Sequence, residues 1–150
     1  MRYCLFVLLF ILSTQSFADI KGKGLFCIGN AKDYFKAKAE HIYVIGYIFP
    51  KKGNIANYVT LFKDDYTDKF KIEEAISNIV FTFESDFILI GKNHKLNRKN
   101  LDLLKVGKYT NLVVAKCVIY KSKRSLMKEM KSLKKKLQKK YDRENEGNKI

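Results

Sequence analysis

Short apolar segments separated by turn-forming residues recur along most of the chain, at intervals of about ten residues. The apolar segments are 25–28, 42–49, 58–62, 70–72, 79–83, 87–90, 101–104 and 112–120. Segments of this length and spacing are typical of strands in an antiparallel barrel or sandwich. We therefore predict a mainly β domain over 19–120: a small antiparallel β-barrel or sandwich of about seven to eight strands.

Side-chain alternation assigns faces to some of these strands. Ile79, Phe81 and Phe83 fall on one face of their segment, because successive side chains of a strand point to opposite sides. The corresponding inward-facing set of the last strand is Val113, Ala115, Cys117 and Ile119. Segment 42–49 is apolar at every position except Gly46, which predicts a strand covered on both faces, with a bulge or a close approach at the glycine.

One segment permits two interpretations. Ile72, Ile76 and Val80 are spaced as on the apolar face of a short helix, and Glu73 and Glu74 would suit its first turn. The strand interpretation of 72–80 stays open beside the helical one.

Residues 1–18 have the three-part pattern of a secretory signal peptide. Arg2 precedes an uninterrupted apolar run over 3–12, and a polar stretch ends in Ser16, Phe17 and Ala18. The apolar run is too short to cross a hydrocarbon core about 30 Å thick. We expect a periplasmic or secreted protein whose mature chain begins at Asp19.

The cysteines predict one disulfide bond. Loss of residues 1–18 removes Cys4 and leaves Cys27 and Cys117, which would lie in an oxidising compartment. Because these residues fall in the first and last strand segments of the body, their bond would join the two ends of the β domain. The chain has no C-x-x-C pair, so we expect a structural bridge and not a redox site.

Several short motifs together resemble a loose group of small uncharacterised exported bacterial β-domain proteins. The motifs are the signal peptide, Gly24-Leu25-Phe26-Cys27, Gly46-Tyr47-Ile48-Phe49, the segment Leu96-Asn97-Arg98-Lys99-Asn100-Leu101 and the late Cys117. In that group an L-[ND]-R-x-[TN]-L segment precedes the last strand and a late cysteine. The resemblance implies an exported single β domain and no known activity or ligand. Considered by itself, Asn97-Arg98 predicts a turn whose arginine bonds backbone carbonyls, with ligand contact as the alternative.

The chain offers few residues for catalysis or metal binding. His41 and His94 have no metal-binding spacing, and no nucleophile elbow, P-loop or dinucleotide fingerprint is present. Asp64, Asp65 and Asp68 lack the glycine of a calcium loop and predict a solvated turn. We therefore expect a non-enzymatic protein with no catalytic residue, no metal and no cofactor.

Residues 121–150 carry much of the excess charge. The formal charge of the whole chain is +15, and this segment contains twelve basic and four acidic residues. An apolar stripe at helical spacing comprises Leu126, Met130, Leu133, Leu137 and Tyr141, with Ser122 or Ser125 as N-cap. The candidate anion-binding residues beside and behind it are Lys123, Lys128, Lys131, Lys134, Lys135, Lys136, Lys139 and Lys140. The sequence predicts a cationic amphipathic helix.

Two interpretations of this helix stay open. It could bind an anionic membrane surface or envelope polymer, or an acidic protein could dock on its apolar stripe. Alternatively, since 26 of the 30 basic residues are lysine, the segment could be a solvated extension that contributes only solubility, or a helix that packs Leu133 and Leu137 on the barrel. Nucleic acid is a poor candidate because arginine is scarce and no reader motif is present. A periplasmic ligand-binding or inhibitor-like barrel is the main alternative function, and a hydrolase a distant one.

Overall fold

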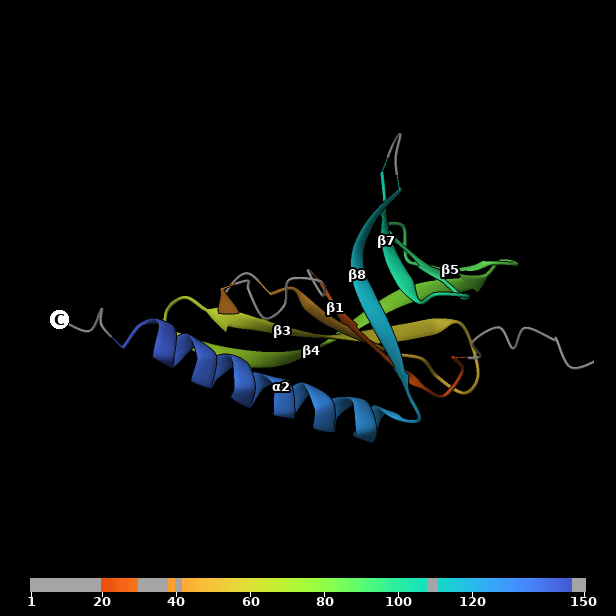
Figure 1. Ribbon diagram of the computed structural model, residues 1–150. Coiled ribbons are helices and arrows are strands. Elements are labelled where there is room, and N and C mark those ends of the chain that lie inside the picture. Colours follow the sequence, from red (N-terminus) through yellow and green to blue (C-terminus); the bar gives the residue numbers. More distant parts are fainter. Residues whose placement is uncertain (1–19, 30–37, 40–41, 108–110, 147–150) are drawn as a thin grey trace, which may run out of the picture.

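The computed structural model describes residues 20–29, 38–39, 42–107 and 111–146. These residues form a closed antiparallel barrel in which each strand pairs with the next and β8 pairs back with β1 (Figure 1). The strands are β1 (Gly24–Ile28), β2 (Val44–Ile48), β3 (Ile55–Asp64), β4 (Lys69–Phe83), β5 (Phe87–Ile90), β6 (His94–Asn97), β7 (Asp102–Val106) and β8 (Asn111–Tyr120), and they are followed by helix α2 (Lys123–Glu144). The predicted fold class is confirmed, and of the two predicted architectures the barrel is the one adopted.

Two strand assignments differ from the prediction. Segments 70–72 and 79–83 belong to the single long strand β4, so the helical interpretation of 72–80 is wrong. Backbone pairing with β3 determines this outcome, and a register shift between Ala56 and Tyr58 accommodates the extra residues of β4. Strand β6 was not predicted because Leu96 is its only strongly apolar residue.

The barrel interior is filled by the protein's own side chains. The fully or nearly fully buried residues of this interior cluster are Ile20, Leu25, Cys27, Ile45, Tyr47, Phe49, Ala56, Phe81, Ile88, Ile90, Leu96, Leu103, Ala115 and Cys117. Phe49 and Phe81 meet edge to face with ring centroids 5.0 Å apart. Of the predicted inward-facing residues of β8, Val113 is the exception at 53% exposed, because the pairing of β7 with β8 shifts register between Leu103 and Leu104.

The predicted disulfide joins the first and last strands where the barrel closes. Cys27 and Cys117 are directly opposite each other in the pairing of β1 with β8, and their Cα atoms are 4.0 Å apart. Both belong to the interior cluster, so the predicted inward orientation of Cys117 is confirmed as well.

Helix α2 covers the outside of the barrel across β1 to β4 (Figure 1). The predicted apolar stripe faces the barrel: Leu126, Met130, Leu133 and Leu137 are at most 5% exposed. The barrel residues buried beneath it are Phe26, Ile42, Val44, Val59, Leu61 and Phe70. This second cluster, which we call the helix–barrel interface, confirms the interpretation in which the helix packs on the barrel.

Glycine allows α2 to approach the sheet closely. A Cβ atom on Gly46 would lie 3.2 Å from Leu126 Cδ2, and one on Gly24 would lie 2.8 Å from Leu126 Cβ. Strand β2 is therefore covered by the barrel interior on one face and by α2 on the other, as its continuous apolar sequence predicted.

Candidate functional site

The candidate functional site is the face of α2 that points away from the barrel. Its orientation is set first at the helix N-terminus, where Ser122 is the N-cap. The Ser122 hydroxyl accepts a hydrogen bond from the Ser125 backbone N–H at 3.2 Å, and the Ser125 hydroxyl accepts one from the Ser122 N–H at 3.1 Å. This reciprocal capping satisfies two backbone donors that a helix would otherwise leave unpaired. An ion pair between Lys123 and Glu74 ties the first turn to β4.

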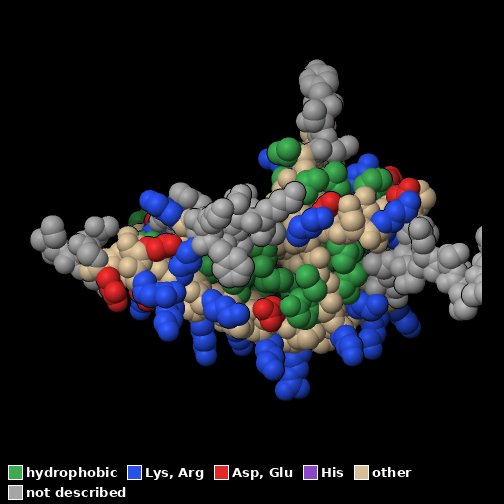
Figure 2. Space-filling model, viewed as in Figure 1, with side chains coloured by type: hydrophobic (Ala, Val, Ile, Leu, Met, Phe, Trp, Pro, Cys, Tyr) green, Lys and Arg blue, Asp and Glu red, His purple; other side chains and the backbone are tan. Residues whose placement is uncertain are grey.

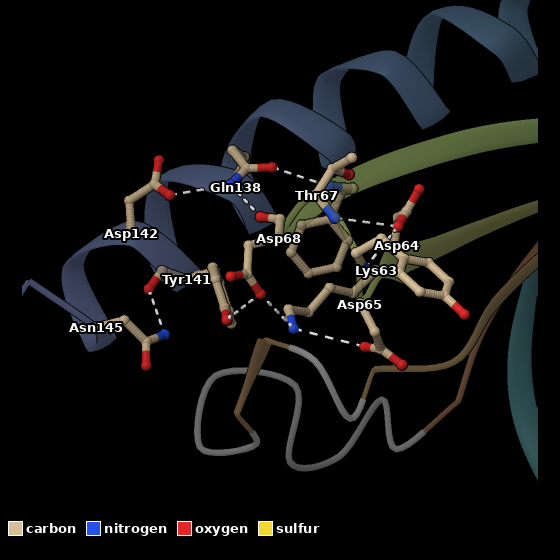
Figure 3. A network of polar contacts seen from close by, with 11 residues as sticks. Lys63, Asp64, Asp65, Thr67, Asp68, Gln138, Tyr141, Asp142 and Asn145 are labelled. Carbon is tan, nitrogen blue, oxygen red and sulfur yellow. Dashed lines mark hydrogen bonds and ion pairs between the residues drawn. The ribbon is translucent and has the colours of Figure 1, made fainter. Parts of the chain in front are cut away.

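The other end of α2 is held by a polar network at the tip of the β3–β4 hairpin (Figure 3). Gln138 Oε1 accepts a hydrogen bond from the Phe70 N–H at 2.9 Å, and its amide nitrogen donates to the Asp68 carbonyl at 3.2 Å. The Tyr141 hydroxyl donates to Asp68 Oδ1 at 2.9 Å, and Lys63 Nζ lies 4.8 Å from the centre of the Tyr141 ring. The helix therefore cannot rotate about its axis without breaking these bonds.

The predicted turn at Asp64, Asp65 and Asp68 is confirmed, and lysines engage its carboxylates. Lys63 pairs with Asp68 at 2.8 Å and with Asp65 at 3.6 Å, and Lys71 pairs with Asp64. The bond from Lys71 lowers the pKa of Asp64, and the bond with Asp68 raises the pKa of Lys63. Among the residues that the structure describes, no three histidine, cysteine or acidic side chains come together as a metal-ligand set.

The structure divides the predicted anion-binding lysines into two groups. Lys123 is paired with Glu74, and Lys140 lies 3.7 Å from Glu144. The remaining lysines have no acidic partner among the described residues: Lys128, Lys131, Lys134, Lys135, Lys136 and Lys139. All of them are exposed except Lys134, which is half-buried.

Arg124 extends this surface at the N-terminal end, and sequence reasoning did not single it out. We call Arg124, Lys128, Lys131, Lys135 and Lys139 the cationic ridge; successive members are three or four residues apart, so they lie on one side of the helix. The 22-residue helix is about 33 Å long. Figure 2 shows basic side chains projecting side by side along this edge of the molecule.

A shallow depression of about 520 Å³ lies within the cationic ridge. Arg124, Lys128, Lys131 and Lys135 line it together with Met127. Lys131 and Lys135, and Lys135 and Lys139, are like charges four residues apart, and each such pair costs a few tenths of a kcal/mol. Packing on the barrel holds the helix together in spite of this repulsion, and bound anions would relieve it.

A second polar group lies at one end of the barrel. His94 is the first residue of β6. It is half-buried, and its Nδ1 lies 3.0 Å from the Tyr47 hydroxyl. Burial and the nearby Lys105 lower the pKa of His94, and burial raises the pKa of Tyr47. The other histidine, His41, lies outside the described residues.

Arg98 bonds backbone carbonyls, as the sequence of its turn predicted. Its guanidinium donates hydrogen bonds to the backbone carbonyls of Glu84 at 3.2 Å and Ser85 at 3.1 Å. The arginine thus joins the β6–β7 turn to the β4–β5 turn.

Comparison with known proteins assigns the chain to no family. No family model matches it, and neither a curated protein nor a solved structure is significantly similar to it. Within the part of the chain that the structure describes, no helix combines the length and apolar character needed to cross a membrane. The predicted signal peptide, 1–18, lies outside the described residues.

Proposed function

We propose that this protein is an exported, non-catalytic β-barrel that attaches to an anionic lipid surface through the cationic ridge of α2. One observation carries the proposal: the apolar stripe of the helix is buried against the barrel. The lysines on the opposite side of the helix are therefore fixed in a row, and they face solvent without acidic partners among the described residues. The internal Cys27–Cys117 bond supports the exported location, because such bonds persist in oxidising compartments.

The packing of α2 determines the manner of attachment. A free amphipathic helix inserts its apolar face into a bilayer, but here Leu126, Met130, Leu133 and Leu137 are already buried on the barrel. The attachment is therefore electrostatic and peripheral. The same burial removes the apolar stripe as a docking surface for an acidic protein in the folded molecule.

The number of basic residues in the cationic ridge sets the expected strength of membrane binding. A basic residue near an anionic membrane contributes about 1 kcal/mol, so the five residues of the ridge supply at most about 5 kcal/mol. Part of this is lost to immobilisation of the protein, and salt screens the remainder because the charges are exposed. The expected result is weak, reversible binding that disappears at high ionic strength.

A pair of triple variants tests the proposal in the full mature chain. Lys128→Gln/Lys131→Gln/Lys135→Gln neutralises the middle of the ridge, and Lys51→Gln/Lys52→Gln/Lys92→Gln removes the same charge from the barrel body. All six lysines are exposed and have no acidic partner among the described residues, so the variants are matched. Truncation of α2 is unsuitable because it would uncover Val44, Val59 and Phe70.

Co-sedimentation with phosphatidylglycerol vesicles is the measurement, with phosphatidylcholine vesicles and soluble polyphosphate as further arms. We expect wild type and the body variant to bind the anionic vesicles equally and the ridge variant to bind at least about tenfold more weakly, since three charges account for several kcal/mol. Equal binding by the two variants would refute a role for α2. Binding to polyphosphate without binding to vesicles would assign the ridge to a soluble polymer and refute the lipid proposal.

A further inference from the structure

Two grooves adjoin at the end of the barrel where β6 begins, away from the cationic ridge. The larger, of about 700 Å³, is lined on its apolar side by Tyr47, Tyr58 and Ile79. The smaller, of about 550 Å³, is lined by Tyr43, Lys105 and Leu112 among others. Both share Asn93 and His94, so these residues stand at the junction between the two grooves.

Among the described residues, the charged side chains that line the two grooves are all basic. Lys92 lines the larger groove and Lys105 the smaller, and no aspartate or glutamate of the described part of the chain lines either. Lys105 and His94 are cross-strand neighbours in the pairing of β6 with β7. A ligand at the junction would therefore meet basic and hydrogen-bonding groups beside apolar and aromatic walls.

His94 has a free position for a ligand. Its Nδ1 is taken by the Tyr47 hydroxyl, and the structure records no partner for Nε2 among the described residues. When the tyrosine hydroxyl donates to Nδ1, the neutral imidazole carries its proton on Nε2 and can donate it. Tyr47 is fully buried, so it fixes the orientation of the ring.

We propose that these grooves bind a small amphipathic carboxylate. Its carboxylate accepts hydrogen bonds from His94 Nε2–H and Lys105, and its apolar body lies against Tyr58 and Ile79 in the larger groove. Charge complementarity selects this class, because a cation would find no counter-charge among the described lining residues and a neutral apolar molecule would leave His94 and Lys105 without a charged partner. The groove volumes, about 700 and 550 Å³, suit a small ligand of this kind.

Decanoate is the test ligand, and decanol, which has the same chain without the charge, is its control. Binding is followed by the NMR signals of the histidine rings in the full mature protein. The chain has only two histidines, and a His94→Gln variant assigns them. We expect decanoate to shift the His94 signal and to raise its pKa, since a bound carboxylate stabilises the protonated ring.

Single-residue variants distinguish decanoate binding at this site from binding at the cationic ridge. Lys105→Gln should weaken decanoate binding about tenfold, as expected for loss of one charged hydrogen-bond partner, and should leave decanol unaffected. Lys128→Gln on α2 should change neither. Equal affinity for decanoate and decanol, an unmoved His94 signal, or full binding by Lys105→Gln would each overturn the proposal without bearing on the function proposed for α2.

Discussion

The close contact between Gly24 and Leu126 yields a quantitative prediction for Gly24→Ala. A Cβ atom at residue 24 would lie 2.8 Å from Leu126 Cβ, 3.0 Å from its Cδ2 and 3.3 Å from its Cγ. The nearest of these atoms is attached directly to the helix backbone, so α2 itself must shift. Overpacking of this kind costs about 1–3 kcal/mol.

The φ angle of Gly24 is not positive, so alanine suffers no backbone strain there. Alanine restricts the unfolded chain and would by itself stabilise a strand position by about 0.5–1 kcal/mol. The net expectation is a loss of about 1–2 kcal/mol, or roughly 3–8 °C in Tm.

Urea denaturation followed by circular dichroism measures this change, and Gly46→Ala is the matched control. The added methyl at residue 46 would meet only side-chain ends, Leu126 Cδ2 at 3.2 Å and Met130 Sδ at 3.4 Å, so the control should change stability by less. In a Leu126→Ala background the penalty of Gly24→Ala should shrink, because two of its three contacts are gone. A Gly24→Ala protein as stable as wild type, or more stable, would refute the close packing of α2 on β1.

Three further changes probe other parts of the structure. Cys27→Ala/Cys117→Ala releases a cross-link over 90 residues and should lower the free energy of unfolding by up to about 4–5 kcal/mol in urea titrations; unchanged stability would mean that the bond does not close the barrel. Arg98→Met removes two hydrogen bonds to carbonyls and should cost about 1–2 kcal/mol, whereas Arg124→Met on the ridge should cost little; equal effects on Tm would contradict the role given to Arg98. His94→Gln should reduce the pH dependence of Tm: because the folded pKa of His94 is lowered below its usual 6.5, the unfolded chain binds more protons as the pH falls below that value, and wild type loses stability that the variant keeps. An identical pH dependence of Tm for wild type and His94→Gln would exclude the burial of that ring.

Local patterns in the sequence were sufficient to predict a mainly β domain, as a barrel or a sandwich, together with its disulfide and the apolar stripe of α2. Each depends on the spacing of a few residues within one segment, such as Leu126 and Met130, or on the small number of cysteines. The continuous apolar character of segment 42–49 even indicated that something covers β2 from outside, although it did not identify α2 as the cover.

Contacts that depend on long-range register could not be predicted in the same way. Gln138 meets the backbone of Asp68 and Phe70 across about seventy residues of chain, and nothing near Gln138 marks it as a bridge. The bond between Tyr47 and His94 likewise requires that β2 and β6 face each other inside a closed barrel. Strand β6 was missed because pairing with both neighbours, and not its own composition, makes it a strand.

The melting temperature of the protein with phosphatidylglycerol vesicles tests most directly whether α2 binds anions while it stays docked on the barrel. A surface that binds only the folded protein stabilises it, by about 2.7 kcal/mol when its concentration is a hundred times the Kd. We predict that such vesicles raise the Tm of wild type and of the Lys51/Lys52/Lys92 variant by several degrees and leave the Lys128/Lys131/Lys135 variant unchanged. A fall in the Tm of wild type would contradict binding through the docked helix, because it would mean that α2 leaves the barrel and buries its apolar stripe in the lipid.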